Sequence, residues 1–146
     1  MKRIIFSEIA DFSYGIIPDK HLISENGEYP IWSGYLYSGF YPLKNTNIDD
    51  LIVVARGVGG TGDVKIATFD CWLTNLSIRV KLLTKDILPK YLFYKFSKNN
   101  LRYLDSGSAQ SQITINDLKR LQFDVHPIDI QHHIVNTTSS LLLKSL

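Results

Sequence analysis

The chain has 146 residues, enough for one domain with a core of its own. Its 16 Lys and Arg against 14 Asp and Glu give a net charge of +2, which excludes a strongly basic module and leaves room only for a local basic patch. A single cysteine excludes an internal disulfide, and no apolar run reaches the ~20 residues that span a bilayer, so we expect a cytoplasmic protein without membrane contact.

The first third of the chain predicts short strands separated by turns. Residues 4–10 are apolar and predict a strand or a first helical turn, whereas residues 11–28 contain Gly, Pro, Asn and Asp and predict a loop. Residues 29–32 predict a strand, and the glycines and aromatic residues of the following SGYLYSGFYP predict a tight hairpin.

The middle of the chain predicts more strands. The run LIVVA at 51–55 is typical of a buried strand, and residues 64–67 and 76–80 predict two others. In the last of these, apolar residues alternate with polar ones, which predicts that one face of the strand is exposed to solvent.

Three glycines follow the buried strand. Gly57, Gly59 and Gly62 match the pattern G-x-G-x-x-G, but a dinucleotide site needs a helix after the third glycine, and a strand is predicted there. We interpret the segment as a turn. Either it is a bare β-turn, or its backbone N–H groups approach phosphate oxygens beside Arg56.

Helices are predicted in the remainder of the chain. One begins near Pro89 and carries an apolar stripe that continues to Leu104. Thr114 and Asp117 have the spacing of a capping box and predict a short helix that ends near Leu121. A strand is expected at 123–125, and an amphipathic helix from 128 onward.

Catalytic patterns are missing from the sequence. The four histidines lack the spacing of metal ligands, and no G-x-S-x-G nucleophile motif occurs. We therefore expect no catalytic residue, no metal site and no cofactor.

Five segments, taken in order, resemble the target-recognition domain of type I restriction–modification specificity subunits. They cover nearly the whole chain and read YPIWSGYLYSGFY, LIVVARGVGGTGDV, WLTNLSIRV, LPKYLFYKF and GSAQSQITINDLKRLQFDVHPIDIQHHIV. The chain departs from the family where the usual Pro-Pro is His126-Pro127 and where Ile130 replaces the acidic residue before Gln131. Its final helix, which stops at Leu146, is also shorter than the family's spacer helices.

The resemblance implies an α+β fold with a mostly antiparallel or mixed sheet, a few helices and a protruding C-terminal helix. Residues 1–126 would be the recognition domain, and residues 127–146 the start of a spacer and dimerisation helix. It further implies a non-catalytic half-subunit that binds double-stranded DNA and directs methyltransferase and restriction subunits to a split target. Methylation and cleavage would belong to those partners, and two copies of the chain would pair through the helix.

The candidate site residues come from the polar loops and the final helix. The expected phosphate contacts are Lys20, Lys44, Arg56 and Lys65. The expected base contacts are Tyr35, Tyr37, Ser108, Gln110 and Gln112. The expected partner or dimer contacts are Ile130, Ile134, Leu141 and Leu142.

Two other hypotheses stay open. The chain could be a protein-interaction or assembly module that acts through its C-terminal helix, in which case Ser, Gly and Gln near residue 110 would be plain helix-capping residues. It could also be a small enzyme that binds a nucleotide at the glycine turn.

Overall fold

The computed structural model describes residues 1–57, 59–105, 107 and 109–144, and from residue 140 onward it describes the backbone alone. Within these residues the strands are β1 (Lys2–Ile5), β2 (Ala10–Tyr14), β3 (Tyr29–Trp32), β4 (Tyr37–Tyr41), β5 (Leu51–Val54), β6 (Val64–Ile66), β7 (Trp72–Leu73), β8 (Ser77–Leu82) and β9 (Gln122–Val125). The helices are α1 (Pro89–Lys98), α2 (Ile115–Lys119) and α3 (Ile128–Lys144), and single 3₁₀ turns lie at Phe6–Glu8, Lys20–Leu22 and Arg102–Leu104.

A four-stranded antiparallel sheet, in the order β2-β8-β5-β6, forms the centre of the molecule. Every residue of β5 is buried, because successive side chains of this strand enter two different cores. Leu51 and Val53 point into the larger core, while Ile52 points into the smaller one. The predicted buried strand is therefore confirmed, and it anchors the loop that follows it.

The larger core lies between the four-stranded sheet and the helices. The buried residues of α1 are Tyr91, Leu92 and Phe96, and Phe96 packs edge-on against Phe123 of β9 at a ring distance of 5.3 Å. α1 begins at Pro89 as predicted, but it ends at Lys98, and the apolar stripe continues through the separate 3₁₀ turn at Arg102–Leu104.

The smaller core lies on the opposite face of the four-stranded sheet, beneath a three-stranded sheet in the order β4-β3-β7. It contains Trp32, Ile52, Ala67, Cys71 and Leu73. The β3–β4 pair is the predicted hairpin, closed by a hydrogen bond from the Ser33 N–H to the carbonyl of Leu36 at 3.0 Å.

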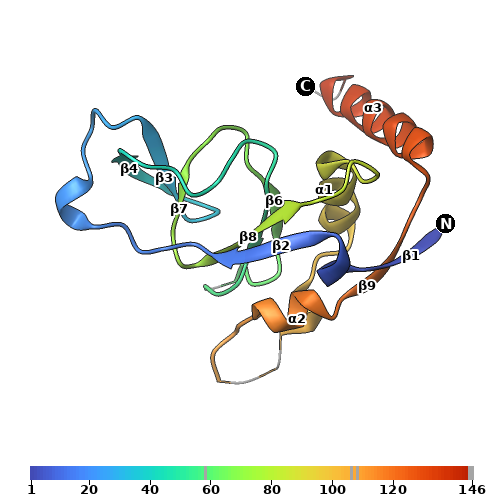
Figure 1. The fold of residues 1–146 in the computed structure, drawn as a ribbon, viewed down its shortest axis with the longest axis horizontal. Helices are drawn as coiled ribbons and strands as arrows, with labels where there is room; N and C mark the ends of the chain where they lie inside the picture. The colour runs from blue at the N-terminus through green and yellow to red at the C-terminus, as the bar shows by residue number, and fades with distance from the viewer. Residues whose placement is uncertain (58, 106, 108, 145–146) are drawn as a thin grey trace.

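The third sheet, β1-β9, joins the two ends of the chain, and α3 follows it directly. Figure 1 shows the three-stranded sheet and α3 at opposite ends of the molecule, with the four-stranded sheet between them. This arrangement of mixed sheets with a few helices and a C-terminal helix confirms the predicted α+β class.

Two local predictions were wrong. Residues 11–14 were expected in a loop, but they belong to β2, because β8 supplies its hydrogen-bonding partners from Lys81 to Ile78. The polar face of β8 was expected to be exposed, yet Ser77 is fully buried and donates to the carbonyl of Ser33 at 2.7 Å. Arg79 on the same face pairs with the buried Asp50 at 2.6 Å. Lys81, the last polar residue of this face, is exposed as predicted. Near Ser77 and Arg79 a second sheet lies over the face, which is a long-range contact that alternation along one strand does not reveal.

Candidate nucleic-acid interface

The glycine loop, defined here as residues 57–62, joins β5 to β6; Gly57 and Gly59 are exposed to solvent, whereas Gly60, Thr61 and Gly62 are buried. Gly57 and Gly59 have φ values of 131° and 82°, a conformation that L side chains rarely adopt. A Cβ at either position would meet nothing within 4 Å, so open space surrounds this part of the loop. Because β6 follows instead of a helix, the dinucleotide pattern lacks the structural context that it requires.

Tyr35 supports the glycine loop from the β3–β4 hairpin. Its hydroxyl lies 3.1 Å from the carbonyl oxygen of Gly60 and also within hydrogen-bond distance of the Asp63 carboxylate. Lys65 Nζ lies 4.8 Å from the centre of the ring. Burial and the hydrogen bond to Asp63 raise the pKa of Tyr35 to about 12, so the phenol stays protonated at neutral pH.

Arg102 also holds the glycine loop, through hydrogen bonds to two of its carbonyl groups. Its guanidinium donates to the carbonyl of Gly59, and its Nε donates to the carbonyl of Thr61 at 3.4 Å. The backbone at Arg102 lies so close that a Cβ on Gly62 would come within 2.3 Å of its nitrogen. Sequence reasoning missed Arg102, since a contact over some forty residues leaves no local pattern.

A second loop, defined here as residues 105–112, is tied together by Asp105. The Ser111 hydroxyl donates to the Asp105 carboxylate at 2.5 Å, and the N–H of Gly107 donates at 3.2 Å. These two hydrogen bonds lower the pKa of Asp105 below its ordinary value. Asp105 is a further residue that the sequence did not single out, although an Asp that accepts from backbone N–H groups is common in turns.

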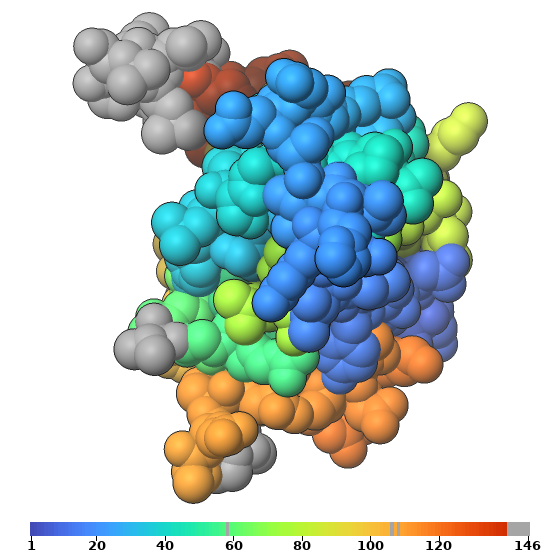
Figure 2. All heavy atoms as spheres, turned by 90° about the vertical axis from the view of Figure 1, so that its left-hand side faces the viewer, coloured from blue at the N-terminus to red at the C-terminus, as the bar shows by residue number. Residues whose placement is uncertain are grey.

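The two loops lie side by side. Arg56 and Gln112 form an isolated antiparallel bridge, and the Ile113 N–H donates to the carbonyl of Ala55 at 2.8 Å. Figure 2 shows both on one face of the molecule, with the green glycine loop directly above the orange second loop. The four-stranded sheet therefore holds the exposed start of the glycine loop and the exposed end of the second loop, residues 109–112, in one place.

A hollow of about 370 Å³ separates the two loops. Arg56 and Gln110 are exposed on its lining, and Gln112 contributes to it as well. Arg56 donates to the carbonyl of Asn75 through Nε at 3.2 Å and Nη2 at 2.9 Å, which holds the guanidinium in place. Three cationic side chains lie at or beside the two loops, those of Arg56, Lys65 and Arg102. Two carboxylates, those of Asp63 and Asp105, accept hydrogen bonds in the same region.

Other predicted site residues do not line this hollow. Lys20 is exposed in a 3₁₀ turn, and Lys44 pairs with Asp70 at 2.9 Å. Tyr37 stacks on Trp32 at a ring distance of 5.8 Å and keeps about half of its surface exposed. Ser108 lies outside the described residues.

The residues of α3 that were predicted to contact a partner differ in their exposure to solvent. Ile130 is 41% exposed, whereas Ile134 is half-buried against the larger core. The side chains of Leu141 and Leu142 lie outside the described residues. Gln131, between these positions, is fully buried, although the sequence indicated nothing about its surroundings beyond its place in a family motif.

The described residues show neither a metal centre nor a membrane span. Among the described residues, no group of three or more His, Cys, Asp or Glu side chains could hold a metal ion. No helix in the described part of the chain is long and apolar enough to cross a membrane.

Comparisons with known proteins agree with this geometry. A family model described as the type I restriction modification DNA specificity domain matches residues 4–144. The fold is similar to that of the S subunit of a type I restriction-modification system from M. genitalium, with a TM-score of 0.76 and 24% identity over 95% of this chain. No curated protein sequence matches the chain.

Two further solved structures share the fold. The HsdS subunit from Thermoanaerobacter tengcongensis matches 98% of this chain with a TM-score of 0.73 and 15% identity. A chain from structural work on complex assembly and conformational transition of the type I R-M system matches 98% with a TM-score of 0.81 and 15% identity. The chain spans only 37–38% of the length of these three structures.

Proposed function

Since the chain belongs to the family of type I restriction–modification DNA specificity domains, we propose that it recognises one half of a split DNA sequence. It does so as a half-subunit without catalytic residues of its own. The family favours this hypothesis over an assembly module or a nucleotide-binding enzyme.

The observation that carries the proposal is the bridge between Arg56 and Gln112, which joins the two exposed loops. Sequence recognition needs polar side chains that a rigid scaffold holds against base edges. The four-stranded sheet, Tyr35, Arg102 and Asp105 supply that rigidity here. The exposed cations beside the loops supply the attraction to phosphate.

Within this proposal the candidate residues take different roles. Arg56, Lys65, Lys20 and Lys44 contact phosphates, and Lys44 exchanges its partner Asp70 for the DNA backbone when it does so. Gln110 and Gln112 contact bases beside the hollow, with Ser108, Tyr35 and Tyr37 around them. Because the hydroxyl of Tyr35 already bonds within the protein, Tyr35 offers its ring surface instead.

The chemistry is proposed to reside on partner chains. Residues 1–126 recognise DNA, and α3 carries the domain to methyltransferase and restriction subunits. A second copy of the chain, paired through α3, would turn one recognised half-site into an inverted repeat.

Selection of bound duplexes from a random pool, with the methyltransferase partner present, tests the proposal. We expect one short sequence to be enriched, and its affinity to fall with salt at a log–log slope near −4.5, the value for about five phosphate contacts. A pool that shows no enrichment above the affinity for random duplex would refute sequence recognition.

Pairing through α3 has a separate test. Deleting residues 128–146 would also remove Gln131 and Ile134 from the protein interior, so a surface substitution is the cleaner choice. Ile130→Asp is expected to abolish self-association in sedimentation experiments, while His133→Asp on the same helix leaves it intact. Self-association that survives Ile130→Asp would exclude this face of α3 as the interface.

A further inference from the structure

Gln131 is the most deeply buried polar side chain at the junction between the domain and α3. Its exposed fraction is 0%, and its amide bonds to three backbone groups. The oxygen Oε1 accepts from the Leu88 N–H at 2.8 Å, where Leu88 immediately precedes α1. The nitrogen Nε2 donates to the carbonyls of Asp86 at 2.9 Å and His126 at 2.8 Å.

These three bonds suit an amide and no other side chain of that size. One atom must accept from an N–H while its neighbour donates to two carbonyls, and an amide group has this combination. A buried amide that lost its partners would be strongly unfavourable, so the bonds fix the side chain and the helix that carries it. Gln131 thereby links α3 to the start of α1 and to the end of β9.

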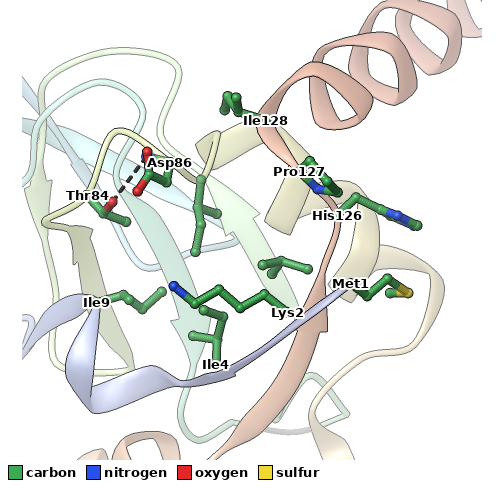
Figure 3. Close-up of a pocket in the computed structure, with 11 residues that line it drawn as sticks. Met1, Lys2, Ile4, Ile9, Thr84, Asp86, His126, Pro127 and Ile128 are labelled. Atoms are coloured by element: carbon green, nitrogen blue, oxygen red, sulfur yellow. Dashed lines mark hydrogen bonds between the residues drawn. The ribbon is translucent and has the colours of Figure 1, made fainter.

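In the part of the chain that the structure describes, α3 makes its other contacts with α1 and with the larger core. Among the described residues, Tyr94 and Ser139 form a second polar link at 3.0 Å, and Ile134 and Val135 pack on the larger core. A hollow of about 410 Å³ lies beside the junction, where the chain passes from β9 into α3. Figure 3 shows His126, Pro127 and Ile128 along one side of it and Asp86 on the other. Close packing therefore does not fix the helix on that side.

We propose that Gln131 is a positioning residue that fixes the angle between the recognition domain and α3, and through it the spacing at which two half-sites are recognised. Two polar links, eight residues apart along the helix, are enough to define the direction of its axis. The part that concerns spacing rests on the proposed function, whereas the part that concerns the angle does not.

The angle is tested by a distance measurement between two nitroxide labels. Ser13→Cys on β2 and Asn136→Cys on α3 provide exposed attachment points. Cys71 is fully buried and its pKa is raised to about 11, chiefly by that burial, so it should stay unlabelled, as the chain without added cysteines will verify. We expect one narrow distance distribution that broadens or shifts in Gln131→Met, which keeps the shape of the side chain but loses all three bonds.

The matched control is Gln122→Met, which makes the same chemical change at an exposed position of β9. An unchanged distribution in Gln131→Met would overturn the proposal, and so would equal broadening in both variants. Circular dichroism and thermal unfolding establish that each variant is folded.

A measurement on the unaltered chain keeps the proposal testable if Gln131→Met does not fold. The Leu88 amide, whose N–H donates to Gln131 Oε1, should exchange slowly with deuterated solvent in the unaltered chain. Fast exchange of this amide in the unaltered chain would show that Gln131 does not hold it, and would overturn the proposal.

The spacing is tested with duplexes that carry two selected half-sites separated by a variable number of base pairs. The unaltered protein should prefer one separation, and Gln131→Met should accept several while each half-site keeps its sequence. An unchanged preference would overturn the link to spacing. A failure to enrich any half-site would refute the proposed function, and the label distances would still decide the role of Gln131 in the angle.

Discussion

Replacing Gly60 with alanine is expected to displace Tyr35 from the glycine loop. An alanine Cβ would lie 2.0 Å from the Tyr35 hydroxyl and 2.5 Å from the ring carbon that bears it. The backbone of Gly60 does not have a positive φ, so the substitution introduces no conformational strain of its own. The whole cost should therefore come from the contacts that Tyr35 gives up.

The expected loss is about 1.5–2 kcal/mol of unfolding free energy. The hydrogen bond to Asp63 contributes about 1 kcal/mol, less than the roughly 1.5–3 kcal/mol of bonds to charged groups, because Tyr35 is 45% exposed and solvent screens the charge. The contact with Lys65 contributes about 0.5–1 kcal/mol more. In a chain that already carries Tyr35→Ala, the three atoms nearest to the alanine Cβ at position 60 are gone, so the alanine should be neutral, or stabilising by about 0.5 kcal/mol.

Urea unfolding of the two single variants and the double variant measures this coupling. Gly60→Ala alone should lower the unfolding midpoint by roughly 1 M at an unchanged slope. Gly62→Ala is the control, since its Cβ would strike the Arg102 backbone and its φ is 94°, so truncating Tyr35 should not rescue it. Effects of Gly60→Ala and Tyr35→Ala that add to within about 0.5 kcal/mol would refute the reasoning.

Three other predictions concern the candidate interface. Arg56→Ala should weaken binding to every duplex and reduce the log–log salt slope by about 0.9 in fluorescence titrations, and a loss confined to one sequence would contradict a phosphate contact. Gln110→Ala should cost about 1–3 kcal/mol on the selected sequence alone, so equal losses on all sequences would exclude a base contact. The pKa of Tyr35 is raised from 10.0 to about 12, so its contribution to stability is complete below pH 10 and is lost as the pH rises through 12. Tyr35→Phe should remove a late step from the alkaline absorbance titration, and a curve that keeps this step would assign it to another tyrosine.

Local sequence patterns predicted several elements because their causes are local. Pro89 begins α1, and the reciprocal bonds of Thr114 and Asp117 cap α2 as their spacing indicated. The apolar run of β5 and the glycine-rich hairpin after β3 formed for similar reasons. In each case a few neighbouring residues carry the whole signal.

Elements that depend on distant partners were not predictable in this way. Residues 11–14 were interpreted as loop because they open a segment that contains Gly, Pro, Asn and Asp, and they form a strand only when β8 lies beside them. Ser77 and Arg79 of β8 are withdrawn from solvent, fully and partly, because a second sheet lies over them. Arg102 and Gln131 act on backbone groups that distant segments bring close, so their residue types alone carried no signal.

By itself, the sequence determined the α+β class, the family and the two loops that form the candidate interface, since ordered motifs and turn residues are properties of consecutive positions. Only the tertiary structure decided that these loops meet across the Arg56–Gln112 bridge, and that a buried amide holds α3 against the domain. The physical reason is that hydrogen bonds and burial depend on distance in space, and pairs such as Leu88 and Gln131 become neighbours only after the chain has folded.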